Sequence, residues 1–393
     1  MGISLFCPRS VDSSSETCGG GANVVGVRTV IARVLGAGLA LAVGALSLGA
    51  LVLSAPASGS PSTRGSAFDP SVAAASVGTA TSRHTKVRVG APILRGVYVG
   101  PADPHGVTAF GVATGTHVAV ASDYLPSSSG WSGMDGAHGS LAWLTGAWQG
   151  SGLTLSLGVP MIPTDAAGQP QGTLALGAAG QYNPYYRTLA STLVSAGEGD
   201  AYLRLGWEFD GNWYAWQAPT VGAEQQYAAY FRQIVTTMRS VPGADFQFVW
   251  NPDASAFTKK GYSLSAAFPG AGYANVVGVD LYDMSWVSPS TPQNAWAETY
   301  LPELSAAESF AAGVGLPLAV CEWGVLIRPA QHGFGDDPYY IENMTAWMLD
   351  PGHDVAYESY FNGNTESSGG SPNQFLLGGQ FPNSLRAFTA SLG

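Results

Sequence analysis

The sequence predicts an α/β fold of the (β/α)8 or TIM-barrel class, and two observations carry this prediction. First, strand-like and helix-like segments alternate from about residue 93 to the end of the 393-residue chain. Eight strand candidates in such alternation are what a closed barrel of this type needs. Second, the first strand candidate runs into Gly100-Pro101-Ala102-Asp103-Pro104, which lacks the glycine spacing of a phosphate-binding loop. A doubly wound sheet, which alternates in the same way, is therefore disfavoured.

The strand candidates are short apolar runs rich in β-favouring residues, and amphipathic helix candidates lie between them. The predicted strands are 93–100, 116–122, 153–162, 201–207, 246–251, 275–282, 316–322 and 355–361. The clearest predicted helices are 138–149, 183–196, 223–240, 292–312, 338–349 and 384–392. Thr220 with Glu224, and Asp337 before Pro338, are suitable helix starts.

The N-terminal part is expected to lie outside the barrel. Arg28 and Arg33 precede an uncharged apolar run from Leu35 to Ala55, and Ala55-Pro56-Ala57 has the small-x-small form of a cleavage site. We therefore read residues 1–57 as a signal peptide, cleaved near Ala57 and followed by export to a secreted form. Because the run is long enough to span a bilayer, a retained anchor on the outer face of the membrane is the alternative. Residues 58–90 are rich in Ser, Ala, Thr and Pro and predict a disordered linker, so the barrel takes 91–393.

Composition restricts the possible partners. The net charge of −11 argues against nucleic acid and anionic lipid surfaces, which need basic patches. The charge does not argue against a neutral polysaccharide as the partner. The content of 46% hydrophobic residues suits one large domain, which we expect to be a monomer.

Cysteine and histidine usage favours neither thiol nor metal chemistry. Cys7 and Cys18 precede the apolar run, and strand alternation predicts that Cys321 is a small buried residue pointing away from its neighbour Glu322. No two histidines have the spacing of a ligand pair, so we expect no metal and no cofactor. The histidines are His84, His105, His117, His138, His332 and His353.

The predicted strand ends carry the candidate site. In a barrel, the C-terminal ends of the strands build the active site. Glu208 ends the fourth strand and Glu322 the seventh, which puts two carboxylates on opposite arcs of one rim. Two carboxylates are the minimum for cleaving a glycosidic bond, since one protonates the leaving oxygen and the other attacks the sugar or activates water. Their spacing in the sequence does not decide between these two outcomes. Either glutamate has a structural alternative, such as an ion pair between Glu208 and Arg204.

Residues around these acids suit a sugar, because aromatic rings cover its C–H faces while polar groups bond its hydroxyls. Arg204 is either an inward charge that orients the acids or a structural ion-pair partner. Asn212 and Asn251 are candidate hydroxyl ligands, although both also fit turns. The aromatic candidates are Trp207, Trp213, Trp216, Trp250, Trp323 and Tyr282. Further acids at the rim are assigned to binding or support: Asp210, Asp253, Asp280, Asp283 and Glu358.

The order Arg204-x-x-x-Glu208, followed by Asn212-Trp213-Tyr214-x-Trp216 in the same stretch, resembles the acid/base strand of glycoside hydrolase family 26, best known for β-mannanases. The segment 317–324, Pro-Leu-Ala-Val-Cys-Glu-Trp-Gly, resembles the nucleophile strand of the clan containing that family. The resemblance implies a retaining double displacement with Glu208 as acid/base and Glu322 as nucleophile. It also implies that Tyr282, at an Asp-x-Tyr strand end, assists the nucleophile.

One position departs from the family pattern, which usually has His immediately before the acid/base, where this chain has Trp207. We therefore expect a secreted retaining glycoside hydrolase acting on a β-linked polysaccharide, with mannan as the default substrate. The alternatives are a glycosidase for another cell-wall glycan and a non-catalytic carbohydrate-binding protein at the cell surface on the same barrel.

Overall fold

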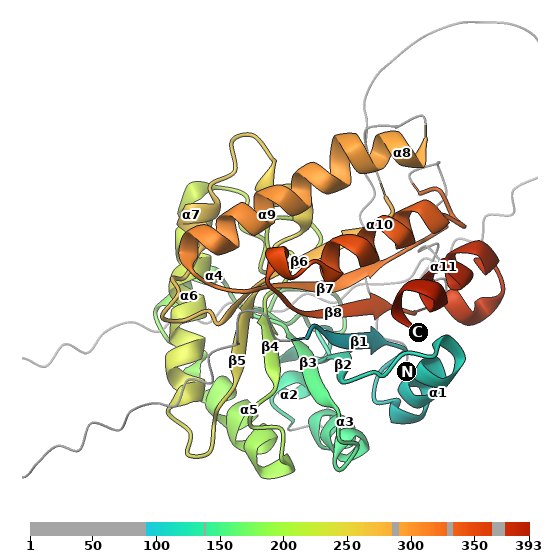
Figure 1. Ribbon diagram of the computed structural model, residues 1–393. Coiled ribbons are helices and arrows are strands. Elements are labelled where there is room, and N and C mark those ends of the chain that lie inside the picture. The colour runs from blue at the N-terminus through green and yellow to red at the C-terminus, as the bar shows by residue number, and fades with distance from the viewer. Residues whose placement is uncertain (1–91, 137–138, 285–290, 328–332, 364–373) are drawn as a thin grey trace, which may run out of the picture. The chain divides into compact units, whose positions relative to one another are not determined.

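The computed structural model describes residues 92–136, 139–284, 291–327, 333–363 and 374–393, and in them the predicted barrel is confirmed. Eight parallel strands hydrogen-bond in chain order, and β8 pairs with β1 to close the sheet (Figure 1). The strands β1 to β8 are Leu94–Tyr98, Val120–Tyr124, Thr154–Val159, Tyr202–Leu205, Gln247–Trp250, Val276–Tyr282, Leu318–Gly324 and Val355–Phe361. The predictions for residues 1–57 and 58–90 lie outside the described residues.

Helices follow the strands and pack outside the barrel (Figure 1). The helices α1 to α6 are Pro104–Thr114, Gly130–Met134, Ser140–Trp148, Leu174–Ala178, Asn183–Ala196 and Val221–Arg239. The helices α7 to α11 are Leu264–Ala267, Pro292–Ala295, Leu301–Val314, Pro338–Leu349 and Pro382–Leu392. A π-helical turn, Trp296–Tyr300, joins α8 to α9, and short 3-10 turns span Ala254–Phe257, Pro351–His353 and Leu376–Gly378. None of the helices in these ranges is long and apolar enough to cross a membrane.

Side-chain caps explain where several helices begin. Thr220 accepts from the Ala223 backbone N–H at 3.2 Å, and Asp337 accepts from two N–H groups of the first turn of α10, as the sequence predicts. Helix α1 is not among the predicted helices. Asp103 caps it and Pro104 occupies its first turn, so the Asp-Pro dipeptide after the first strand is a helix start.

The strands separate two sets of side chains. Alternate residues face the barrel interior, where a small cluster fills the centre, and the others pack against the helices in the main core. The interior cluster consists of Val120, Tyr202, Val249, Val276, Ala319, Cys321 and Tyr357. Arg204 and Asn251 lie two positions beyond Tyr202 and Val249, and therefore point to the same interior at the C-terminal end of the barrel.

A β-bulge in β7 corrects the prediction for Cys321. In the pairing of β6 with β7, Val279 lies opposite Val320, but Asp280 lies opposite Glu322, so Cys321 is an extra residue. Cys321 therefore joins the interior cluster, on the same side as Glu322, instead of pointing to the opposite face. It is fully buried as predicted, and its Sγ lies 3.1 Å from the Tyr357 hydroxyl.

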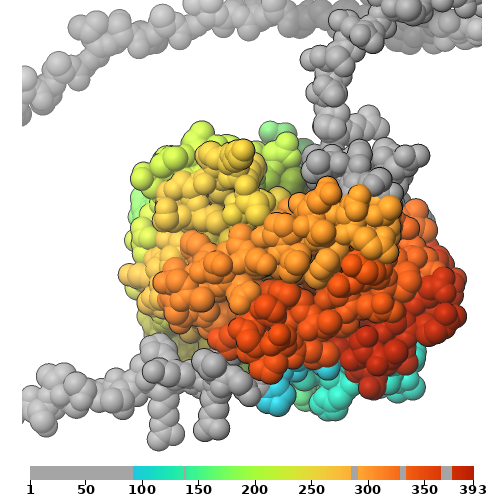
Figure 2. All heavy atoms as spheres, turned by 45° about the horizontal axis from the view of Figure 1, so that its top comes forward, coloured from blue at the N-terminus to red at the C-terminus, as the bar shows by residue number. Residues whose placement is uncertain are grey.

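The C-terminal helix completes the outer layer. Phe388 of α11 packs edge-on against Phe110 of α1, with ring centroids 5.6 Å apart. The Thr116 hydroxyl also donates to the Leu392 carbonyl at 3.4 Å. Figure 2 shows the atoms of the C-terminal half, in orange and red, as one continuous surface. The last helix thereby covers the seam where β8 meets β1, which keeps both ends of the barrel's chain together.

Candidate active site

Glu322 ends the interior face of β7 and is held by three donors. Its Oε1 accepts from the Tyr124 hydroxyl at 2.7 Å and from Arg204 Nη2 at 2.5 Å. Its Oε2 accepts from the Tyr282 hydroxyl at 2.6 Å. Hydrogen bonds to both oxygens fix the orientation of this carboxyl group. This contact agrees with the predicted role of Tyr282 beside the nucleophile candidate.

Arg204 lies at the centre of the site and is fully buried. Its Nη2 contacts Asp280 at 2.9 Å in addition to Glu322, and its Nε donates to the Asn251 side chain at 2.6 Å. Arg204 forms its ion pairs with Asp280 and Glu322 and not with Glu208, so the alternative of a structural pair between Arg204 and Glu208 is wrong. Arg204 thus binds Asp280 and Glu322 from the barrel interior, and Asn251 supports Arg204. Both residues are fully buried, so neither is exposed to a sugar.

Glu208 lies in the turn that follows β4 and has a strained backbone. Its φ is +49°, a left-handed value that costs a non-glycine residue about 1–2 kcal/mol. Its N–H donates to the Asn251 carbonyl at 2.8 Å, which ties the turn to the end of β5. Its Oε2 accepts from Trp213 Nε1 at 2.7 Å. Strain of this kind persists where the surrounding structure fixes a side chain for function.

The carboxyl groups of Glu208 and Glu322 face each other. One oxygen from each of Glu208, Asp280 and Glu322 lies within 4.8 Å of the other two. Retaining glycosidases place their two carboxyl groups about 5–5.5 Å apart, whereas inverting enzymes need about 6.5–9.5 Å to admit a water. The close approach of Glu208 and Glu322 therefore matches the retaining geometry.

The surroundings of Glu208 and Glu322 differ. Burial, followed by the charges of Asp280, Glu322 and Asp253, raises the pKa of Glu208 well above that of an ordinary glutamate. Glu322 instead has an arginine and two hydroxyls as donors. A carboxyl that stays protonated is what a general acid needs in order to give a proton to a glycosidic oxygen.

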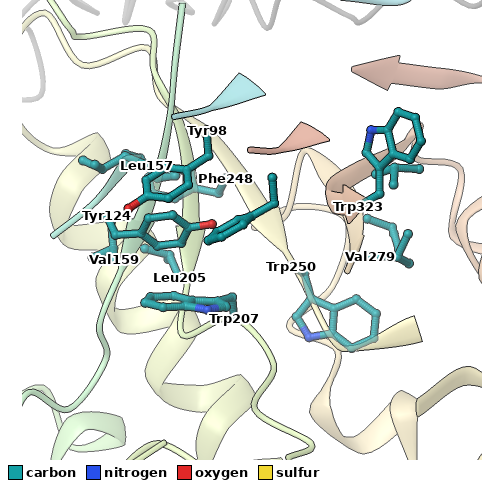
Figure 3. Packing of buried hydrophobic residues seen from close by; sticks show 14 of the residues in the cluster. Tyr98, Tyr124, Leu157, Val159, Leu205, Trp207, Phe248, Trp250, Val279 and Trp323 are labelled. Carbon is teal, nitrogen blue, oxygen red and sulfur yellow. The ribbon is translucent and has the colours of Figure 1, made fainter. Parts of the chain in front are cut away.

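A group of packed aromatic rings, the aromatic wall, lies beside the site, and most of its residues were not predicted from the sequence. Tyr98 at the end of β1 packs on Phe361 at the end of β8, with ring centroids 4.5 Å apart, and edge-on to Tyr124 at 5.2 Å. Tyr124 in turn packs on Trp207 at 5.4 Å. Figure 3 shows Tyr98, Tyr124 and Trp207 as one column. Tyrosines at the ends of β1 and β2 are the signal that could have revealed this wall.

Three of the predicted sugar platforms are wrong. Trp250 and Trp323 are fully buried and lie apart from the aromatic column (Figure 3), because each is adjacent on its strand to an inward-facing residue. Trp250 packs among Phe209, Phe268 and Phe310, and Trp323 stacks on Phe388 of α11. Trp216 is 1% exposed, because it stacks on Tyr214 at 4.4 Å and donates to the Trp207 carbonyl.

The remaining candidates differ in position. Trp207 is 2% exposed, and its Nε1 donates a hydrogen bond to the Tyr214 hydroxyl at 3.0 Å. It therefore supports the aromatic wall more than it covers a sugar. Asn212 is exposed and Trp213 partly exposed, so both remain accessible to a ligand. Of the rim acids, Asp280 belongs to the site itself. Asp283 and Glu358 are buried in the outer packing, where Glu358 accepts from Trp323 Nε1 at 2.6 Å.

The three converging carboxylates Glu208, Asp280 and Glu322 are also the residues that could hold a hard cation, since such ions prefer oxygen ligands. Arg204 already neutralises two of them at 2.5 and 2.9 Å. A metal ion at this point would have to compete with a buried guanidinium, so the donor set fits a metal poorly.

The closed barrel is shared with solved glycosidases. The modular endo-β-1,4-mannanase from Cellulomonas fimi is 18% identical, with a TM-score of 0.55 over 76% of this chain and 70% of that one. The catalytic domain of an endo-β-1,4-mannanase from Bacillus sp. JAMB-750 is 18% identical, with a TM-score of 0.56 over 78% and 87%. At these identities the similarity establishes the fold alone. No curated protein matches the sequence.

Fold and facing carboxylates define the class of protein as a glycoside hydrolase built on a (β/α)8 barrel. The sequence model described as Glycosyl hydrolase family 26 matches residues 201–299, about a quarter of the chain and the part that carries Glu208. Residues 201–299 are therefore similar to glycoside hydrolase family 26, and the resemblance identified in the sequence is confirmed over that part of the chain.

Proposed function

We propose that the protein is a retaining endo-β-glycanase that cleaves β-linked polysaccharide by double displacement. The observation that supports this most strongly is the pair Glu208 and Glu322, which approach within 4.8 Å from opposite sides of one barrel end. The mannanase activity of the relatives named above makes β-mannan the first substrate to test.

In the first step, Glu322 attacks the anomeric carbon while Glu208 gives its proton to the glycosidic oxygen, and the C–O bond electrons leave with the departing sugar. This forms a covalent glycosyl-enzyme. In the second step, Glu208, now a carboxylate, removes a proton from water, which displaces Glu322 from the same carbon. Two inversions return the original anomeric configuration.

The test of this proposal is a panel of soluble β-glycans, including β-1,4-mannan, with new reducing ends and products analysed at mildly acidic and neutral pH. Replacing Glu322 with Gln keeps the shape of the side chain but removes the attacking carboxylate. We expect Glu322→Gln to lose several orders of magnitude in kcat with an unchanged far-ultraviolet circular dichroism spectrum. Near-native activity in this variant would remove Glu322 from the mechanism.

The glycan is the finer part of the proposal. Trp207, in place of the usual His beside the acid/base, puts an apolar ring next to Glu208, which favours testing glucan and xylan beside mannan. A carbohydrate-binding protein without activity is the second candidate, because the exposed Asn212 and the partly exposed Trp213 could contact a sugar whether or not it is cleaved. Binding of a panel glycan without new reducing ends would support it against the hydrolase.

We also propose export. The apolar run from Leu35 to Ala55 and the Ala55-Pro56-Ala57 sequence support cleavage near Ala57, with an uncleaved anchor on the outer face of the membrane as the alternative. The mass of the N-terminal peptide of the protein recovered from its native host distinguishes the two forms.

A further inference from the structure

Trp213 approaches Glu208 with the edge of its indole ring. Its Nε1 donates to Glu208 Oε2 at 2.7 Å, and the side chain is only partly exposed. An indole N–H is a donor and never an acceptor. Oε2 must therefore accept this bond, and the proton that Glu208 gives to a substrate belongs on its other oxygen, Oε1.

The turn after β4 is shaped to hold the indole in this position. A Cβ atom on Gly211 would lie 2.3–2.5 Å from ring atoms of Trp213, closer than side-chain carbons ever approach. Gly211 does not have a left-handed φ, so its missing side chain provides space and not conformational freedom. The Gly211 N–H also donates to the Glu208 carbonyl at 3.1 Å, which connects the two residues through the backbone.

We infer that Trp213 is a positioning residue for the acid/base Glu208, and this inference rests on the function proposed for that glutamate. The indole directs Oε1 toward the glycosidic oxygen by holding Oε2. When the Oε1 proton moves to the leaving oxygen, Glu208 becomes a carboxylate. The bond from Trp213 is then charge-assisted, and such bonds are roughly twice as strong as neutral ones. Trp213 therefore stabilises the transition state more than the ground state, which raises kcat.

Other charged and titratable groups face Glu208 from neighbouring elements. Asp280 comes from β6, Glu322 from β7, Asp253 from the segment after β5, and Tyr214 from the same turn as Trp213. The three carboxylates raise the pKa of Glu208, and the Trp213 N–H acts against them. Loss of this donor should therefore move the basic limb of the pH profile of kcat/KM to higher pH.

The test is Trp213→Phe, which keeps an aromatic ring and removes the N–H. It is assayed on β-1,4-mannan, or on the panel glycan that the wild type cleaves, and on the 2,4-dinitrophenyl glycoside of the same sugar. On the glycan we expect kcat to fall roughly 10- to 100-fold with KM within about twofold, the effect of one hydrogen bond to a charged group. On the dinitrophenyl glycoside kcat/KM should be nearly unchanged, because that leaving group needs no proton.

Gly211→Ala provides the second variant, since its methyl group displaces the indole without removing it, and it should give the same pattern. Trp143→Phe is the matched control, because Trp143 is 59% exposed on α3 and outside the site, and it should behave as the wild type.

The outcomes separate the inference from the proposed function. A rise in KM on the glycan with unchanged kcat would make Trp213 a sugar platform and overturn the inference. Equal losses on both substrates, or no change in the basic limb, would overturn it as well. A wild type that cleaves neither substrate would refute the proposed function, and the positioning role with it.

Discussion

At the scale of single residues, some groups of the site could be predicted from the sequence and others could not. The acids, Arg204 and Tyr282 were recognisable because they end predicted strands and follow a family pattern. The structure brings them together around one carboxylate, Glu322. The predictions for Trp250 and Trp323 were wrong because Trp250 directly precedes Asn251 and Trp323 directly follows Glu322. The side chains of adjacent residues on a strand face opposite sides of the sheet.

A residue-scale prediction follows from the left-handed backbone of Glu208, whose φ is +49°. Glu208→Gly and Glu208→Ala both remove the carboxyl, but only glycine adopts this φ without a steric penalty. We expect the Gly variant to be more stable to unfolding than the Ala variant by about 1 kcal/mol, measured by urea denaturation. An Ala variant that is equally stable would mean that Glu208 stores no backbone strain.

At the scale of elements, the apolar periodicity predicted which segments are strands and helices, and turn chemistry set their ends. Strand 355–361 and helices 183–196 and 338–349 were predicted with the observed bounds. The second strand was predicted at 116–122 but runs from Val120 to Tyr124, because its polar Asp123 continues the ladder after the apolar run ends. That shift hid Tyr124, and the aromatic wall with it.

The pairing of β2 with β3 gives an element-scale prediction. Tyr124 lies opposite Gly158, where a Cβ would come within 2.5 Å of the Tyr124 ring. Gly158→Ala should therefore push the Tyr124 hydroxyl away from Glu322 and leave this proposed nucleophile less firmly oriented. We expect kcat to fall roughly tenfold or more, the effect of losing one hydrogen bond to a charged group, measured on the cleaved glycan.

The control for that variant is Gly146→Ala, because a Cβ at Gly146 on the exposed side of α3 meets nothing within 4 Å. This variant should retain full activity. If Gly158→Ala did so too, the Tyr124 contact would have no part in orienting Glu322.

At the scale of the whole molecule, the barrel buries several carboxyl groups in addition to Glu208 and Glu322. Burial raises the pKa of Asp283 and of Glu303 to about 8, of Asp210 and of Glu358 to about 7, and of Asp123 to about 6. Between the ordinary carboxyl range and these values, the folded protein binds more protons than the unfolded chain. Folding stability therefore falls as the pH rises through this window.

We therefore expect the melting temperature to be highest near pH 5 and to decrease steadily toward pH 8, measured by calorimetry in buffers of equal ionic strength. Glu358→Gln should reduce the slope between about pH 5 and pH 7, because it removes a group whose pKa burial raises to about 7 while keeping its shape. A melting temperature that rises between pH 5 and pH 8 would contradict this account of the buried acids.

The central claim, that Glu322 forms a covalent bond to the sugar, is tested most directly by trapping the intermediate. The enzyme is incubated with the 2,4-dinitrophenyl 2-deoxy-2-fluoro glycoside of the sugar it cleaves, and the intact mass and the labelled peptide are determined by mass spectrometry. The account predicts one added fluoroglycosyl group, located on Glu322 and absent in Glu322→Gln. A label on any other residue, or a glycan-cleaving enzyme that inverts the anomeric configuration and takes up no label, would contradict it.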